Sequence, residues 1–506
     1  MSVKPAAPDG VVLVLLAIAG VLLLSGLGNG CLWQDEAETA VLARNTLRFG
    51  YPRAFDGQSW VEVDWLGYGP GEAWVYSPWL PFYLLAGVFA LAGESTAIAR
   101  LPFALFGLAS VYLTWRLARL LTGDRRVQRL SVALLICSVP FLLHMRQCRY
   151  YAMGTALLMA TCCAYLRWLN DPSLKRAVVL GLVLVLLFHT NFGTFVPAFA
   201  AVVVHQAVWG LRAGRRRFAA ACAIVAGLTI PWALFFYRSA FVGAFSLGRA
   251  ADHLEYYVRV TNKYLAPLAF MAGMSALGWL ARRSGWWRGR PATFRAPAPA
   301  VWRFLILMVG AQALFLLVPD QRHMRYLIPT LPLLLIGEAW WIAVWMTRAR
   351  IMGWLFALLA LFTNVLQSPH VRIPLTDLVY ELTHEYRGPM DGVIGYLRGH
   401  ARPGETAKIP YDDRTLVFYT GLAVERPSQF QQESYPDWVI IRRDWIPGEF
   451  FTSGYFKRIE AAYDRIELDA PDLLWQNRED PGSHHFRTVQ NASPVVIYRK
   501  RNVYHG

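Results

Sequence analysis

Two adjacent carboxylates, Asp35 and Glu36, follow the first long apolar segment of the chain, in the stretch WQDEAETAV. A carboxylate at a dry interface can have a raised pKa and accept a proton from an incoming hydroxyl or amine. The pair therefore predicts a catalytic site, with Asp35 as general base and Glu36 in support. The spacing of Asp35 and Glu38 also fits a capping box at a helix N-terminus. The two roles can coexist, because a cap leaves one carboxylate oxygen free.

Two arginine pairs lie in the stretches HMRQCRYYAM and QRHMRYLIP, interleaved with histidine and tyrosine. Guanidinium groups bind phosphate oxygens bidentately, so these stretches predict an anion site with phosphate as the natural ligand. The alternative is that each long side chain only reaches the membrane interface from a helix end. Four arginines facing an acidic loop favour the anion site. The predicted phosphate-binding residues are Arg146, Arg149, Tyr151, Arg322, Arg325 and Tyr326.

A third group of polar residues could contact a substrate. It consists of His144, His189, Asn191 and His323. The alternative for His189 and Asn191, in FHTNFGTF, is an ordinary satisfied helix end. The sequence contains no H-E-x-x-H, paired CxxC, P-loop or G-x-S-x-G pattern. Metal-ligand spacing is therefore absent, and a divalent metal at Asp35 would require Asp35, Glu36 and a histidine to converge in space.

Bulk composition predicts a membrane protein rather than a soluble one. Hydrophobic residues make up 55% of the chain and charged residues 17%, with a mean hydropathy of +0.31, whereas a soluble domain is close to a quarter charged. The formal net charge of +16 could suggest nucleic acid, but the arginines stand mainly in short loops between apolar segments. We therefore expect membrane lipids, and no nucleic acid, among the partners.

The apolar segments predict about 11 membrane spans, each needing roughly 17–25 mostly apolar residues. They lie near 11–27, 98–121, 128–143, 152–168, 177–192, 194–210, 218–237, 263–281, 302–318, 325–346 and 351–367. The segment 78–93 is interpreted as an interfacial or re-entrant helix, because a crossing there would move every later basic loop to the outer side. The pair 177–192 and 194–210 would turn at Gly193. Residues 238–262 are expected to form a long outer loop of a size suited to a mobile gate.

Loop charge predicts the orientation of these spans. Residues 116–129 hold five arginines and one acid, whereas residues 28–77 hold seven acids and three arginines. Short basic loops stay in the cytoplasm, so the N-terminus is expected inside, with residues 28–77 and the C-terminal tail outside. All the candidate site residues then meet on the outer face. Cys31 and Cys148 also reach this face, but no disulfide spacing pattern joins them.

The last part of the chain predicts a separate domain. After residue 368 the long apolar runs stop, and short β-like runs appear at 437–441 and 493–500 with helix-like stretches between them. This pattern is typical of a small α/β domain. We expect a membrane domain over residues 1–368, with an outer loop and interfacial helices over 28–97, and an extracytoplasmic α/β domain over residues 369–506.

Five stretches, in this order, resemble the polyprenyl-phosphate-dependent glycosyltransferases of the GT-C superfamily, which include protein O-mannosyltransferases and the lipid A aminoarabinose transferase. WQDEAETAVLARNTLRFGYP is similar to the first outer loop of the family, and 77–111 to its proline-led interfacial helix and following span. RQCRYYAM places Arg149 and Tyr151 on the Arg and Tyr of the family, and HTNFGTF and RHMRYLIPTLP match two further motifs. Gln147 stands where many relatives have an acid, and Tyr76 or Ser77 where a histidine is common.

The resemblance implies a GT-C-like α-helical polytopic fold in the bacterial inner (cytoplasmic) membrane. It implies transfer of a sugar from a polyprenyl-phosphate donor, such as undecaprenyl phosphate, to a lipid, glycan or protein acceptor, with inversion. The reaction would turn a phosphodiester into a more highly charged phosphomonoester, and arginines would stabilise the charge that grows toward the transition state.

A transporter or lipid flippase with an external domain is the competing hypothesis. Such a protein would carry charged residues buried at mid-span and helices broken at the membrane centre. The predicted spans hold essentially no ionisable residue at mid-span apart from His205. The sequence therefore favours the glycosyltransferase.

Overall fold

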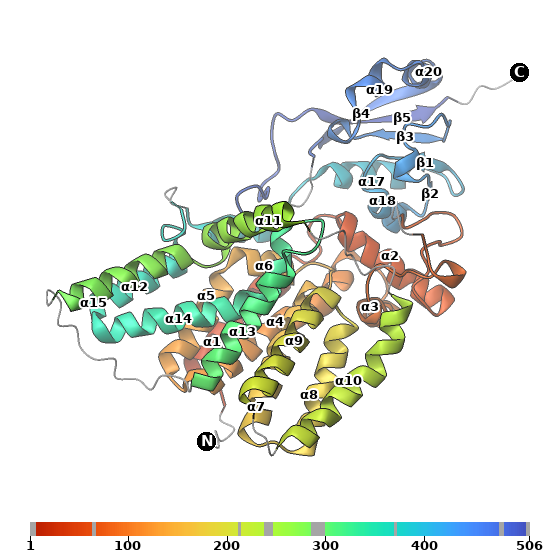
Figure 1. The fold of residues 1–506 in the computed structure, drawn as a ribbon. Helices are drawn as coiled ribbons and strands as arrows, with labels where there is room; N and C mark the ends of the chain where they lie inside the picture. The colour runs from red at the N-terminus through yellow and green to blue at the C-terminus, as the bar shows by residue number, and fades with distance from the viewer. Residues whose placement is uncertain are drawn as a thin grey trace, which may run out of the picture.

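A computed structural model describes residues 7–62, 67–210, 214–236, 246–284, 299–368, 372–474 and 480–501. Its larger part is a bundle of long helices, and a smaller domain with a sheet lies on one end of the bundle (Figure 1). The helices of the bundle are α1 (Gly10–Leu24), α2 (Gln34–Phe49), α3 (Leu80–Ala92), α4 (Thr96–Thr122), α5 (Arg125–Cys137), α6 (Val139–Met145), α7 (Tyr151–Asn170), α8 (Leu174–Phe188), α9 (Phe192–Trp209), α10 (Arg215–Phe235), α11 (Leu247–Val260), α12 (Leu268–Arg283), α13 (Pro299–Phe315), α14 (Leu331–Arg348) and α15 (Arg350–Phe362).

Each predicted span overlaps at least one of these helices, and 128–143 covers parts of both α5 and α6. Among the described residues, five helices are long and apolar enough to cross a membrane, or up to seven if each of two bent pairs is one span. One pair, α5 and α6, bends by 69° at Ser138, where Pro140 opens the second helix. The other bends by 82° between α11, which continues through a π-helical turn at Thr261–Leu265, and α12. The prediction of about 11 spans stays a prediction.

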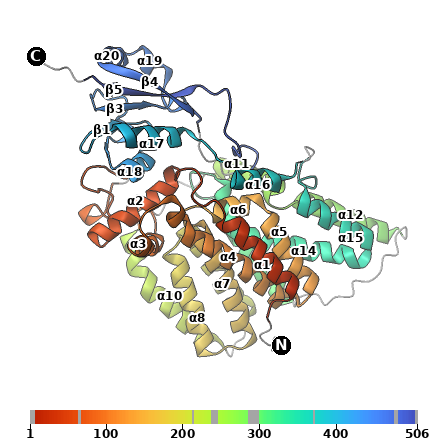
Figure 2. The same cartoon turned by 180° about the vertical axis from the view of Figure 1, so that it is seen from behind.

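Helix α3 corresponds to the segment 78–93. It lies beside α2 at the end of the bundle that carries the smaller domain, in both views (Figures 1 and 2). The backbone N–H of Leu80 donates to the carbonyl of His189, in the turn between α8 and α9, at 3.1 Å. The indole of Trp79 packs against Trp232 and Phe236 at the end of α10. Helix α3 therefore covers the ends of α8 to α10.

Three expectations about this part are wrong. The described part of the 238–262 loop, from residue 246 onward, is mostly helical, because α11 places its buried residues His253, Tyr257 and Val260 on one face. The turn between α8 and α9 falls at residues 189–191 rather than at Gly193, because Asn191 caps α9 by accepting from the N–H of Thr194. A second ionisable residue does lie inside a span, since Glu338 of α14 is only 3% exposed.

The smaller domain contains the predicted mixed α/β structure. Its elements are α16 (Pro374–Thr383), α17 (Pro389–His400), β1 (Thr406–Lys408), α18 (Asp413–Thr420), β2 (Ala423–Val424), β3 (Trp438–Ile441), α19 (Gly448–Thr452), α20 (Gly454–Ala462), β4 (Tyr463–Pro471) and β5 (Pro494–Lys500). The strand order is β2-β1-β3-β5-β4, with β1 parallel to β2 and β3, and β5 antiparallel to β3 and β4. The predicted strands at 437–441 and 493–500 are β3 and β5.

The sheet is covered on both faces, which explains the continuous apolar run of β3. Trp438 and Ile440 point into the core that the domain shares with the bundle, while Val439 and Ile441 point into a second core with Phe450. Helices α17 and α18 lie between the sheet and α2, and α19 and α20 lie on the far face (Figures 1 and 2). The smaller domain therefore rests on α2 through its helices.

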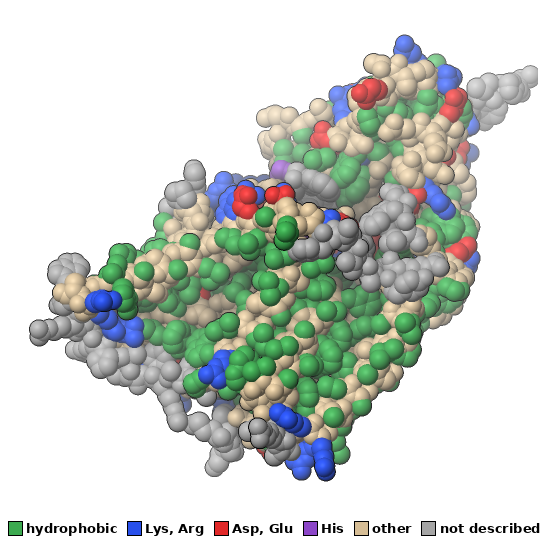
Figure 3. All heavy atoms as spheres, viewed as in Figure 1, with side chains coloured by type: hydrophobic (Ala, Val, Ile, Leu, Met, Phe, Trp, Pro, Cys, Tyr) green, Lys and Arg blue, Asp and Glu red, His purple; other side chains and the backbone are tan. Residues whose placement is uncertain are grey.

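Charge is distributed unevenly over the bundle. In Figure 3 the flank of the helices is mostly hydrophobic. Lys and Arg lie along its lower and left edges, whereas at the upper edge, near the smaller domain, they lie beside Asp and Glu. This pattern agrees with basic loops at one membrane surface and the smaller domain beyond the other.

Cysteine labelling can test this orientation. Exposed residues are available at Ser95 and Gln431 on the domain side, and at Arg125 and Arg216 on the basic side. We expect Ser95→Cys and Gln431→Cys to react with a membrane-impermeant maleimide on intact cells. Arg125→Cys and Arg216→Cys should react only after permeabilisation, and the parent chain gives the background. Reaction of Arg125→Cys on intact cells would contradict the single-face arrangement.

Candidate active site

The N-terminus of α2 gives the two adjacent carboxylates, Asp35 and Glu36, different roles. Trp33 precedes the helix, and its backbone N–H is 3.4 Å from Oε2 of Glu36, so Glu36 occupies the capping-box position. The expected cap of Asp35 with Glu38 is therefore wrong by two positions. As a result, the Asp35 carboxylate is not used to cap the helix and remains available for contacts with other elements.

Glu36 joins three segments of the bundle. Arg100 of α4 donates from Nε to Glu36 Oε1 at 2.8 Å and from Nη2 to Oε2 at 2.7 Å. The N–H of Cys148 also donates to Oε1, at 2.8 Å. The remaining Arg100 donors bind backbone carbonyls of the segment before α2, including those of Asn29 and Cys31. The fully buried Glu36 thus fixes α2 against α4 and the turn before α7, and it is not accessible to a reactant.

Asp35 lies where two predicted arginines converge. Nη1 of Arg325 donates to Oδ2 of Asp35 at 3.1 Å, and Nη2 of Arg149 is 3.8 Å from the same oxygen. Burial alone would raise the pKa of Asp35. The positive charges of Arg149 and Arg325, with a smaller contribution from Arg414, outweigh burial and lower the pKa below the ordinary value of 3.8. The expectation of a raised pKa is therefore wrong, and Asp35 is a carboxylate at neutral pH.

The smaller domain supplies a third arginine. Arg414, at the start of α18, forms an ion pair with one oxygen of Glu38, while Nη1 of Arg149 binds the other oxygen at 2.6 Å. Side chains of the smaller domain reach the N-terminal end of α2 at other points as well, since Gln34 donates to Asp413 at 2.5 Å. Glu38 therefore holds two guanidinium groups beside Asp35.

Arg414 and its neighbours are not among the residues predicted from the sequence. Two acids stand beside the arginine in the stretch YDDR (411–414), which is the local signal that could have drawn attention to it. Tyr411 in the same stretch stacks on Trp445 at 3.9 Å, and burial raises the pKa of its hydroxyl. The negative charge of Asp35 contributes to that shift, which indicates that Tyr411 is close to Asp35.

Two of the predicted phosphate-binding arginines are held elsewhere. Nη1 of Arg146 donates to the carbonyls of Leu22 and Leu23, at 2.7 and 3.2 Å, near the C-terminal end of α1. The exposed Arg322 donates to the carbonyl of Asp252 and lies over the ring of Tyr256, both on α11. The structure therefore brings Arg149 and Arg325 to Asp35, and it uses Arg146 and Arg322 to hold other helices.

The predicted tyrosines lie with the arginines. The guanidinium of Arg325 is 5.9 Å from the ring centre of Tyr326. Tyr151 begins α7, packs against Tyr150 with ring centres 4.6 Å apart, and is subject to the charges of Arg325 and Arg149. Together with Asp35 they make a mixed aromatic and cationic site.

The predicted histidines and Asn191 divide between this site and the ends of helices. His323 is near enough to Asp35 to contribute to its lowered pKa. His144 is buried, binds the Pro140 carbonyl through Nδ1 at 2.8 Å, and packs against Tyr151. His189 is 3.3 Å from the Leu228 carbonyl and contacts Trp232, and Asn191 caps α9. His189 and Asn191 therefore have the helix-end roles of the alternative interpretation.

The donor set near Asp35 does not fit a divalent metal ion. In the described ranges, no group of three or more His, Cys, Asp and Glu side chains is placed to hold one. The groups that surround the carboxylate are guanidinium ions, which would repel a cation.

Cys31 and Cys148 are not joined by a disulfide.

Comparison with known proteins gives the fold. The family described as dolichyl-phosphate-mannose-protein mannosyltransferase matches residues 76–237, about a third of the chain. The structure of ArnT from Cupriavidus metallidurans bound to undecaprenyl phosphate superimposes with a TM-score of 0.60 at 14% identity, covering 99% of this chain and 100% of that one. The chain has the GT-C glycosyltransferase fold.

Two further structures agree with the GT-C fold. ArnT in the apo state matches with a TM-score of 0.55 at 14% identity over 96% of both chains. Arabinofuranosyltransferase AftD from Mycobacteria matches with a TM-score of 0.54 at 14% identity over 98% of this chain and 40% of that one. No curated protein matches the chain by sequence. The GT-C fold, with its apolar helices, makes this a multi-pass membrane protein.

The Glu36–Arg100 pair should be a major source of stability. Glu36→Gln removes a charge that a buried arginine needs, and we expect it to cost about 3 kcal/mol or more. Glu94→Gln is a matched control, because Glu94 pairs with Arg44 at 2.5 Å in a partly exposed position and should cost at most about 1 kcal/mol. Thermal unfolding of the full chain in one detergent measures both. Equal losses would contradict the structural role of Glu36.

Proposed function

We propose that the chain transfers a sugar from a polyprenyl-phosphate carrier to an acceptor molecule. The reaction would take place beside Asp35, on the extracytoplasmic face of the bacterial inner membrane. The observation that carries the proposal is the convergence of Arg149 and Arg325, from two separate turns of the bundle, on one oxygen of Asp35. The GT-C fold and the partial family match support the class of reaction. The acceptor is a lipid, glycan or protein.

Charge explains why these groups suit that reaction. The bond between the anomeric carbon and the phosphate oxygen breaks, and the phosphate of the carrier gains negative charge as it leaves. Arg149 and Arg325, with the hydroxyls of Tyr151 and Tyr326 beside them, would bind this phosphate. Arginines fixed by Glu38 and Asp35 before the reaction need little rearrangement to stabilise the growing charge. They bind the product phosphate more strongly than the substrate phosphate, which favours the transition state.

Asp35 would act on the opposite side of the sugar. Its carboxylate orients the acceptor hydroxyl and takes the proton as the new bond to the anomeric carbon forms, which inverts that carbon. A lowered pKa makes Asp35 a weak base before the reaction. Proton transfer therefore comes late, when the bonding acceptor oxygen has become acidic. Glu36 would act only by positioning Asp35.

Removal of the Asp35 charge tests this role. We expect Asp35→Asn to lower the turnover of a glycosylated polyprenyl phosphate by roughly 100-fold or more. Binding of undecaprenyl phosphate should remain within about threefold of the parent, since one carboxylate next to the phosphate site is lost and no arginine is. Turnover is measured as release of the polyprenyl phosphate in vesicles. Retention of more than about a tenth of the parent activity would exclude Asp35 as the base.

The arginine assignments can be tested by substitution with lysine, which keeps the charge and loses the planar fork. Arg149→Lys and Arg325→Lys should each lose about tenfold or more in turnover, with weaker binding of undecaprenyl phosphate. Arg146→Lys and Arg322→Lys are matched controls, because the structure places both on backbone carbonyls of other helices. The controls should retain most activity. If the two control variants lost more turnover than Arg149→Lys and Arg325→Lys, the phosphate site would lie away from Asp35.

A further inference from the structure

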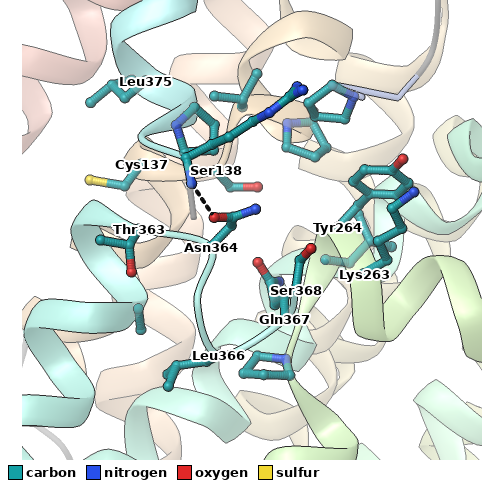
Figure 4. Close-up of a pocket in the computed structure, with 18 of the residues that line it drawn as sticks. Cys137, Ser138, Lys263, Tyr264, Thr363, Asn364, Leu366, Gln367, Ser368 and Leu375 are labelled. Atoms are coloured by element: carbon teal, nitrogen blue, oxygen red, sulfur yellow. Dashed lines mark hydrogen bonds between the residues drawn. The ribbon is translucent and has the colours of Figure 1, made fainter. Parts of the chain in front are cut away.

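A cavity lies apart from Asp35, among α5, α14, α15 and the start of α12. It has a volume of about 920 Å³, within the range of small-molecule sites. Residues from the segments 363–368, 372–377 and 480–486 also line it. In Figure 4, Asn364 faces Lys263 and Tyr264 across this space, and Gln367 and Ser368 lie below them. None of the lining residues belongs to the Asp35 site described above.

Glu338 is the most unusual residue of the lining. It is one turn beyond Leu335 on α14 and about 10 Å along the helix axis from Leu331, where the helix begins. Its side chain is 97% buried from bulk solvent, and no described residue forms a hydrogen bond or ion pair with it. A carboxyl inside a membrane protein without a partner is costly. Such a group points to a ligand that supplies hydrogen-bond donors.

The charges of the lining argue against an anionic ligand. Lys263 and Arg372 are its basic residues, and Glu338, Asp377 and Asp480 are its acids. This balance contrasts with the three arginines around Asp35. A phosphate group would therefore meet more carboxyl groups than cations here. The lining fits a neutral ligand better.

The neutral polar groups of the lining indicate the ligand class. Hydroxyl and amide side chains of Ser138, Asn364, Gln367, Ser368 and Ser483 face the cavity. Groups of this kind, together with a carboxyl, can donate to and accept from the adjacent hydroxyls of a sugar. Tyr264 and Phe486 add aromatic rings, which can pack on the apolar face of a sugar ring.

The surroundings of the cavity indicate a lipid tail. Leu134, Leu335 and Leu361 form apolar parts of its wall. Outside it, α15 exposes large apolar side chains, with Ile351 83% and Leu358 52% exposed. Such a surface is stable only against hydrocarbon. An amphiphile could therefore place its head in the cavity and its tail along α15.

We propose that this cavity binds the neutral, hydroxyl-rich sugar head of a membrane glycolipid, with Glu338 as the main acceptor of its hydroxyl hydrogens. The site is separate from Asp35 and does not depend on the transfer reaction proposed there. Asp35→Asn should therefore leave this binding unchanged.

A photoreactive alkyl β-glucoside, added to the full chain in phosphatidylcholine vesicles, tests the proposal. We expect saturable crosslinks within residues 134–140, 263–267, 360–368 and 372–377. Glu338→Leu should raise the probe concentration at half-saturation about tenfold, because hydrogen bonds to the sugar are lost. Glu338→Gln should retain most binding. Gln206→Leu is the matched control, since Gln206 is also a buried polar side chain in a span and its amide atoms have no described partner. It should bind like the parent.

Competition distinguishes the sources of the sugar. Unlabelled alkyl glucoside should displace the probe, while methyl glucoside and an alkyl phosphocholine should not at the same concentration. Equal competition by methyl glucoside would overturn the lipid assignment, and equal competition by the phosphocholine would overturn the sugar assignment. Parent-like binding by Glu338→Leu, or crosslinks confined to other segments, would overturn the site itself.

Discussion

The buried ion pair of Glu36 and Arg100 is the interaction on which the candidate site depends. A buried charge is tolerated only where its hydrogen-bonding capacity is satisfied, and Glu36 achieves this with donors from α4 and from the turn before α7. The same contacts fix the first turn of α2 and the segment before it. Asp35 and Arg149 each lie one residue away from a member of this network. Their separation is therefore set by a buried structure, although both are partly exposed.

Balance of charge decides what the site can bind. Asp35 and Glu38 hold three guanidinium groups among them, so the local charge stays positive when both acids are ionised. The lowered pKa of Asp35 is the other side of this balance, because the cations that would attract a phosphate also stabilise the carboxylate. If the pKa of Asp35 were raised, Asp35 would be a stronger base. A raised pKa would, however, mean that the surrounding positive charges attract an anion less strongly. In the proposed reaction, this arrangement would favour phosphate recognition over basicity.

Local patterns in the sequence predicted much of this structure, and distant contacts explain most of the rest. Apolar runs predicted the helices, the change after residue 368 predicted the sheet domain, and the resemblance selected Arg149. Arg146 and Arg149 are the same residue type in the same short stretch of sequence. What distinguishes them is that Arg146 donates to backbone carbonyls at the end of α1. Arg414 contacts Glu38 across 376 positions of sequence. The YDDR stretch marks Arg414 locally, but nothing in it indicates Glu38 as the partner. Glu338 was overlooked because the apolar run around it dominates its segment.

The contact of Arg414 with Glu38 has a consequence for biosynthesis. The ribosome makes Glu38 early and Arg414 only after some four-fifths of the chain. Until α18 has folded onto α2, Glu38 lacks one of its two cations and the cluster beside Asp35 is incomplete. A nascent chain that has already inserted its helices thus has an unfinished site. The charge cluster beside Asp35 is therefore completed only when the small domain has packed on α2.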